Sequence, residues 1–410
     1  MDTFTLIAAL ITISALISYL NLRFIKLPGA IGVMFVSILL SIFILVTGKA
    51  FPTAFNFIRE LTRSIDFTKT LLDIMLAFLL FASAFHFEYK KLQEQKRPVL
   101  VLSTIGVVGS TIIFGLLLDI TTTLLGIDLP LVYCFLFGAL ISPTDPVAVM
   151  SVLKKSRIPN SLETIISGES LLNDGVGLIL FVTIGEVAAQ EATFSMSNAL
   201  ELFAKEVFGG LALGAGTAIV TGYLTKKIQE FQTAVLVSIS MVMMISIMGG
   251  LLHVSIPLAA VAAGLILGSS SIGAKSNKEL QDYLHRFWEL IDELLNIILF
   301  VMIGLQIVVM PFIGHYWFIG LVAVLFVLIA RGVSIAVPSM IMRRSLKTNF
   351  NNTAILVWAG LRGGISVALA LSLPESPYKR LILSASYIIV VFSVIVQGLT
   401  LNKVVNRFVK

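Results

Sequence analysis

The sequence has little charge and almost no cysteine. Only 13% of its 410 residues are Asp, Glu, Lys or Arg, and its single cysteine, Cys134, lies in an apolar run. A soluble protein carries roughly twice that charged fraction, and the apolar runs described below exclude a very apolar soluble α/β protein. One cysteine forms no intrachain disulfide. The basic residues lie in short loops, which argues against a nucleic-acid partner, and the N-terminus lacks the basic segment of a cleaved signal peptide.

The sequence contains many long apolar runs. The chain is 57% hydrophobic, with a mean hydropathy of +1.00. The runs often exceed about 18 residues and are continuous rather than alternating, which favours membrane-spanning helices over a β-barrel. We predict an all-α polytopic membrane protein in one domain, 1–410, with about thirteen spans: 4–22, 27–47, 69–88, 98–118, 129–153, 161–186, 203–225, 231–252, 257–271, 288–310, 316–342, 351–373 and 381–402.

The basic residues predict an orientation in the cell membrane. Of the 29 Lys and Arg residues, Arg331 and Arg362 lie inside predicted spans. The loops on one side hold twenty of the others, and the loops on the opposite side hold seven: Lys49, Arg59, Arg63, Lys69, Lys205, Lys379 and Arg380. Basic loops stay in the cytoplasm. The N-terminus is therefore expected outside and the C-terminus inside.

The sixth span contains the strongest chemical signal. Its centre carries two carboxylates, Glu169 and Asp174, with Ser170 and Asn173 between them. An Asp at the centre of a membrane helix costs roughly 2.5–3.5 kcal/mol on insertion scales, and such groups usually line an ion or proton path. Ser170 and Asp174 are one helical turn apart, as are Glu169 and Asn173. The pattern predicts a cluster of oxygen ligands for a dehydrated monovalent cation or a proton.

The fifth span carries a second signal at Ser142–Pro146, which reads Ser-Pro-Thr-Asp-Pro. Its two prolines remove backbone donors and clash with the preceding turn, so the helix is expected to break. Broken helices in membranes line cavities and build transporter sites near the midplane. Thr144 and Asp145 are therefore expected among free backbone groups at a binding site. The alternative is a simple proline kink with Asp145 near an interface.

Two deep arginines form the third signal. Arg331 interrupts the eleventh span, and Arg362 lies in the twelfth among Gly360, Gly363 and Gly364, which indicate a second break. An arginine stays charged, so each needs a carboxylate or helix carbonyls beside it. Two broken spans seven apart suggest an inverted repeat, in which spans four to six match spans eleven to thirteen.

Other polar residues give weaker signals. Glu289, Asp292 and Glu293 are interpreted as the solvated start of the tenth span. The roles of Asp73, near the outer end of the third span, and of His86, near its cytoplasmic end, stay open.

Four segments together resemble one transporter family. Residues 168–175 (Gly-Glu-Ser-Leu-Leu-Asn-Asp-Gly), 142–146, 287–293 (Phe-Trp-Glu-Leu-Ile-Asp-Glu) and 360–364 (Gly-Leu-Arg-Gly-Gly) resemble the NhaP and NHE-type sodium/proton antiporters, in that family's order. The resemblance covers nearly the whole chain. It implies a secondary active transporter rather than an enzyme, with no cofactor.

The resemblance also implies a role for each residue of the ion site. Asp174 would be the carboxylate that binds cation or proton, and Asp145 its companion on the broken helix. Thr144 and Ser170 would supply neutral oxygens, so that Na⁺ would bind at Asp174, Ser170 and Thr144. Asn173 beside Asp174 matches the electroneutral branch of the family.

The remaining charges and the domains follow from the same resemblance. Glu169 would pair with Arg331, and Arg362 would balance the crossing half-helices. A core of 98–190 and 316–405 would move against scaffold helices, 1–90 and 200–310, that form a homodimer in the bilayer.

The residues favour a competitive mechanism. Desolvation favours the neutral form of a buried Asp174, and a bare Na⁺ or Li⁺ offsets that penalty as a proton does. The alternatives are K⁺/H⁺ exchange by the same fold, a cation channel, for which the sequence shows no filter, and an intramembrane aspartyl protease. The residues around Asp145 and Asp174 differ from those of the protease class.

Overall fold

The computed structural model describes residues 2–153, 158–189, 196–269, 278–310, 313–341 and 350–408. The secondary structure of this part is helical. The helices are α1 (Thr3–Leu20), α2 (Gly29–Thr47), α3 (Pro52–Ser64), α4 (Phe67–Lys69), α5 (Leu76–Phe85), α6 (Tyr89–Glu94), α7 (Lys96–Val101), α8 (Val107–Leu124), α9 (Leu131–Ile141), α10 (Pro146–Leu153), α11 (Asn160–Ala189), α12 (Met196–Thr225), α13 (Phe231–Leu252), α14 (Ile256–Gly268), α15 (Lys278–Gln306), α16 (Ile313–Ile341), α18 (Phe350–Trp358), α19 (Gly364–Ser372), α20 (Pro377–Phe392) and α21 (Gly398–Phe408). Four π-helical segments, Asn21–Ile25, Thr70–Met75, Leu102–Gly106 and Ser393–Gln397, adjoin α-helices.

The helix lengths confirm an all-helical polytopic membrane protein. In the described part of the chain, ten helical stretches are long and apolar enough to cross a bilayer. The other three predicted spans correspond to helices of a different kind. The ninth is the short apolar helix α14, the tenth is the more charged helix α15, and the twelfth is divided between α18 and α19.

Helix α15 begins earlier than the sequence pattern indicated. The tenth span was expected at residue 288, but the helix starts at Lys278. Its first turns are amphipathic and charged, and a search for apolar runs does not register such turns. The helix therefore extends about three turns before Glu289, Asp292 and Glu293, which stay predicted as the solvated start of the tenth span. They lie about three to four turns into it, where side chains can face an internal cavity.

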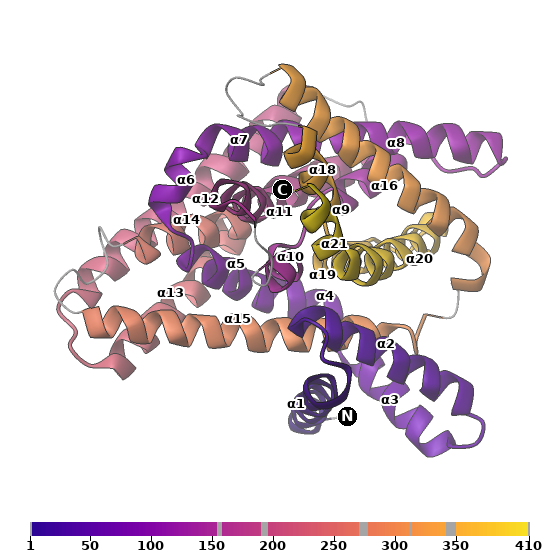
Figure 1. The fold of residues 1–410 in the computed structure, drawn as a ribbon, viewed down its shortest axis with the longest axis horizontal. Coiled ribbons are helices and arrows are strands. Elements are labelled where there is room, and N and C mark those ends of the chain that lie inside the picture. Colours follow the sequence, from indigo (N-terminus) through magenta and orange to yellow (C-terminus); the bar gives the residue numbers. More distant parts are fainter. Residues whose placement is uncertain are drawn as a thin grey trace.

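Helix α15 connects the parts of the molecule around the two broken helices. Figure 1 shows it as a long helix beside α13, α5 and α2, and it packs against each of them and against α19. Helix α5 packs mainly on α14, whereas α16 packs on α8 and α20. The broken helices α9/α10 and α18/α19 lie near the centre of the view (Figure 1).

The first break follows from its proline residues. Helix α9 ends at Ile141, and α10 begins at Pro146, at the first helical position, where a missing N–H is not needed. Asp145 precedes Pro146 and caps the new helix. The second break runs from Ala359 to Gly363. The two breaks touch, because the Asp145 backbone N–H donates to the carbonyl of Leu361 at 2.7 Å.

Candidate ion site at the crossing of two broken helices

Asp145 caps the half-helix α10 at the first break. Its Oδ1 atom accepts hydrogen bonds from the backbone N–H groups of Val147 at 2.9 Å and Ala148 at 3.1 Å. The positive end of the α10 dipole adds to this stabilisation of a negative charge. Gly363 passes so close to the Asp145 carboxylate that a Cβ atom there would overlap it. The glycine thus allows the second break to approach the first.

Arg362 lies at the opposite half-helix end. The residue is 0% exposed, and its Nη1 atom donates to the carbonyls of Ser142 and of Pro143, the latter at 2.8 Å. These carbonyls follow the end of α9, where the helix dipole is negative. The Arg362 backbone N–H donates to the Ser393 hydroxyl at 2.8 Å. The arginine of one break therefore compensates the carbonyl end of the other.

Glu169 and Arg331 form a buried ion pair with two parallel hydrogen bonds. Arg331 Nη1 donates to Glu169 Oε1 at 2.9 Å, and Nη2 donates to Oε2 at 2.8 Å. Nη2 also donates to the carbonyl of Leu356 at 3.2 Å. This two-pronged geometry joins α11 to α16 and satisfies both carboxylate oxygens.

Three neutral side chains link this ion pair to the first break. Asn173 Nδ2 donates to Glu169 Oε1 at 2.8 Å and to Thr144 Oγ1 at 2.7 Å. Asn173 Oδ1 accepts from the Thr144 backbone N–H at 3.3 Å. The hydroxyls of Thr144 and Ser170 share a hydrogen bond of 2.8 Å. Asn173 thus fixes the orientation of the break relative to α11.

Asp174 is the remaining carboxylate at the crossing, and it is 4% exposed. Among the described residues, the structure gives its carboxylate no hydrogen bond or ion pair. The side chain lines a cavity of about 40 Å³ together with Asp145, Thr144 and Gly363. A buried carboxylate without a protein partner is costly as an anion, so the site favours a bound proton or cation.

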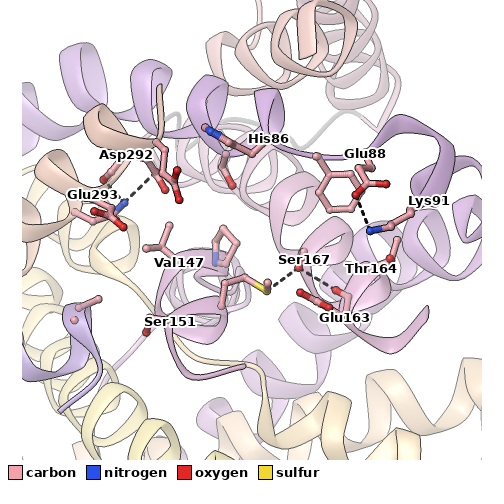
Figure 2. A pocket seen from close by; sticks show the side chains of 18 of the residues that line it. His86, Glu88, Lys91, Val147, Ser151, Glu163, Thr164, Ser167, Asp292 and Glu293 are labelled. Atoms are coloured by element: carbon pink, nitrogen blue, oxygen red, sulfur yellow. Dashed lines mark hydrogen bonds and ion pairs between the residues drawn. The ribbon is translucent and has the colours of Figure 1, made fainter. Parts of the chain in front are cut away.

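A larger cavity of about 640 Å³ adjoins this site and is here termed the vestibule. Figure 2 shows Glu163 on one side and Asp292 and Glu293 on the other, with Val147 of α10 between them. The vestibule has five acidic lining residues: Glu88, Glu163, Glu289, Asp292 and Glu293. Lys91 also lines the cavity and pairs with Glu88 at 2.7 Å, so acidic residues still outnumber basic ones, and clustered negative charge in a cleft concentrates cations. Sequence reasoning missed this cavity because its acidic residues come from three separate helical regions.

His86 forms part of the vestibule rim, and His285 lies next to it. His86 lines the cavity, and its Nε2 atom lies 2.9 Å from the carbonyl oxygen of His285. Burial, and secondarily the neighbouring His86, lower the pKa of the His285 imidazole. His285 therefore stays neutral near pH 7 and does not oppose the negative field of the vestibule. The side chain of Asp73 lies outside the described residues.

Comparison with known proteins gives a consistent result. The model of a family described as "Sodium/hydrogen exchanger, transmembrane" matches residues 11–407. The chain is 38% identical to the Na⁺/H⁺ antiporter NhaP of Pseudomonas aeruginosa, over 98% of this chain and 96% of that protein. It is 29% identical to the Na⁺/H⁺ antiporter NhaH of Halobacillus dabanensis, over 99% and 98%. Its fold is similar to the sodium proton antiporter MjNhaP1 of Methanocaldococcus jannaschii, with a TM-score of 0.79, 17% identity and coverage of 100% and 99%.

The buried ion pair generates a stability prediction. Glu169→Ala leaves the Arg331 guanidinium buried and unpaired, a change that costs roughly 3–5 kcal/mol. We expect a large fall in melting temperature in detergent for Glu169→Ala and for Arg331→Ala. The double variant should lose less stability than the two single losses added together, because no charge is left unpaired. Strict additivity in this double-mutant cycle would show that the two side chains are not energetically coupled.

Gly360 provides a second prediction about the same arginine. A Cβ atom at Gly360 would overlap the Arg331 guanidinium, which its bonds to Glu169 hold in place. We expect Gly360→Ala to destabilise the protein by about 1–3 kcal/mol, as overpacking does. The matched control is Gly332→Ala, next to Arg331 in α16, where a Cβ meets no atom within 4 Å. Alanine should stabilise that helix slightly. Equal shifts in thermal unfolding for the two variants would contradict this explanation.

Proposed function

This chain belongs to the sodium/hydrogen exchanger family, and from that premise we propose that it exchanges Na⁺ or Li⁺ for H⁺ across the cell membrane, one for one. The family makes it a multi-pass membrane transporter and not an enzyme. The observation that carries the proposal is Asp174, a buried carboxylate without a protein partner on the wall of a small polar cavity. The other buried charges at the crossing are compensated by the protein itself.

Asp174 is the group for which cation and proton compete. As a bare anion in a desolvated cavity it is unfavourable, and either a proton or a small monovalent cation removes that penalty. One carboxylate holds one or the other, not both. If the carrier changes conformation only when Asp174 is neutralised, movement of a cation in one direction is coupled to movement of a proton in the other.

The neutral oxygens beside Asp174 are suited to complete the cation shell. Ser170 lies one turn before Asp174 on α11, and its hydroxyl already meets Thr144. A hydroxyl keeps lone pairs free while it donates one hydrogen bond, and it can rotate to direct them at an ion. Na⁺ bound at Asp174, Ser170 and Thr144 would thus receive the hard oxygen ligands that it prefers.

Asp145 acts beside this site rather than in competition for the proton. Its hydrogen bonds to the α10 amides favour its charged form, whereas nothing in the described structure does so for Asp174. Its negative charge contributes to the field at the cavity that the two carboxylates share. Asn173 carries no titratable group, so one proton is exchanged for each monovalent cation and no net charge moves.

Alternating access follows from a division of the chain. The core, 98–190 and 316–405, contains both breaks and Asp174, and the scaffold, 1–90 and 200–310, contains α5, α14 and the length of α15. We propose that the core moves against the scaffold and that two scaffolds form a homodimer. The vestibule opens beside Lys91 and Asn160, at the end of the bundle that carries the basic loops. The positive-inside rule assigns this end to the cytoplasm.

The central prediction concerns Asp174. Asp174→Asn keeps the shape of the side chain but removes its charge, so cation-driven pH change in proteoliposomes should fall to background. Asp145→Asn should also impair exchange severely, although an amide can still cap α10. The control is Asp119→Asn, at a half-buried position of α8 outside both cavities, which should transport normally. Normal exchange by folded Asp174→Asn would refute the proposed function. Addition of K⁺ in place of Na⁺ tests K⁺/H⁺ exchange in the same assay.

The stoichiometry has a separate electrical test. Proteoliposomes are clamped at different membrane potentials with valinomycin and K⁺, and proton movement driven by Na⁺ is measured. One-for-one exchange moves no net charge, so neither its rate nor its final pH gradient should follow the imposed potential. A gradient that tracks the potential would refute electroneutrality and would indicate that a second carboxylate, Asp145, also releases a proton.

A further inference from the structure

The vestibule and the ion site share part of their lining, and this shared part is here termed the neck. Ser83, Pro146, Val147 and Asn296 line both the vestibule and the small cavity that contains Asp174. A cation that moved from the vestibule to Asp174 by the shortest route would pass these four residues.

The neck lies where a cation must lose water. The vestibule has room for hydrated ions, whereas the small cavity has a volume of about 40 Å³. Much of the small cavity's wall is apolar and formed by Leu76, Leu79, Leu80 and Leu299. Removing a cation from water without replacement ligands is strongly unfavourable. The passage therefore needs protein oxygens at the neck, before the cation reaches Asp174.

Asn296 offers such an oxygen. The residue is 4% exposed, and its Nδ2 atom donates to the Asp292 carbonyl at 2.7 Å and to Asp292 Oδ1 at 3.1 Å. Both partners are acceptors, so the NH₂ group must face Asp292, and the orientation of the amide is settled. Among the described residues, the structure gives Asn296 Oδ1 no hydrogen-bond donor. This oxygen therefore keeps its lone pairs free for a ligand in the cavity.

Ser83 supplies a second oxygen at the same neck. It lies on α5, is half-buried, and within the described ranges its hydroxyl has no hydrogen-bond partner. The remaining neck residues, Pro146 and Val147, lie on the half-helix α10. The two oxygen-bearing residues thus belong to the proposed scaffold, whereas α10 and Asp174 belong to the proposed core.

We propose that Asn296 Oδ1 and Ser83 Oγ form a second, transient site for the monovalent cation, where it exchanges water for protein oxygens on its way to Asp174. This inference rests on the proposed function and adds a selectivity element to it. Asp292 holds the donor end of the Asn296 amide away from the path and places a negative charge beside it. The site lies on the scaffold side of the neck, so the cation passes from a fixed ligand pair to the moving carboxylate.

The test compares Li⁺ with Na⁺ in the Asn296→Ala variant. Li⁺ is the more strongly hydrated ion, so loss of a replacement ligand should penalise it more. We expect kcat/KM for Na⁺ to fall on the order of tenfold and kcat/KM for Li⁺ to fall further. Ser83→Ala should shift the Li⁺ to Na⁺ ratio in the same direction, and it provides the test if Asn296→Ala does not fold. The matched control is Asn160→Ala, an exposed vestibule amide outside the small cavity.

The outcomes separate the two proposals. Unsubstituted protein that exchanges neither cation for protons would overturn the proposed function itself. Normal exchange by that protein, with Asn296→Ala and Ser83→Ala unchanged or equally impaired for Li⁺ and Na⁺, would overturn the neck site alone. A fall in the Li⁺ to Na⁺ ratio in these variants but not in Asn160→Ala supports it.

Discussion

The crossing of two broken helices is the arrangement on which the site depends. Each break leaves half-helix ends inside the membrane, where no bulk water can satisfy them. In the structure, groups of one break form hydrogen bonds with groups of the other. The Asp145 carboxylate accepts hydrogen bonds from the backbone N–H groups at the start of α10. The backbone N–H of Asp145 donates to the carbonyl of Leu361 in the other break. Arg362 from the second break meets the carbonyls at the end of α9. Asp145 and Arg362 therefore stabilise the half-helix ends of the fold as well as placing charge at the ion site.

Asp174 differs from the other buried carboxylates at the crossing, because the charges of those carboxylates have partners in the protein. Glu169 is neutralised by Arg331, and Asn173 binds the same carboxylate while it orients the first break. Asp145 has its two amides. A site in which every charge had a fixed partner would have no affinity for a transported ion. Within the described part of the chain, Asp174 is the buried carboxylate at the crossing without a protein partner, and the cost of burying its charge supports the proposal that a proton or cation binds there.

Sequence reasoning predicted the deep charges and the two breaks because both depend on rare residue types in apolar surroundings. A charged residue such as Glu169 or Arg331 within an apolar span can be recognised from the sequence alone. Because it needs a charged or polar partner inside the membrane, few other residues can be that partner. The start of α15 at Lys278 was not predicted, since its amphipathic turns lack an apolar run. Ser83 and Asn296 gave no signal, because a single neutral polar residue in a membrane helix is common. Their shared position at the meeting of two cavities appears only in the structure.

The hydrogen bonds of Asn173 favour a neutral side chain at this position of the ion site. Its amide both accepts from the Thr144 backbone N–H and donates to Glu169. An aspartate at this position could accept the first bond but not donate the second, and it would bring an anion against Glu169, which Arg331 alone would then have to balance. The two-sided hydrogen bonding of Asn173 thus favours an amide here. With an amide at this position, Asp174 is the titratable member of the adjacent pair, and this supports the one-for-one exchange proposed above.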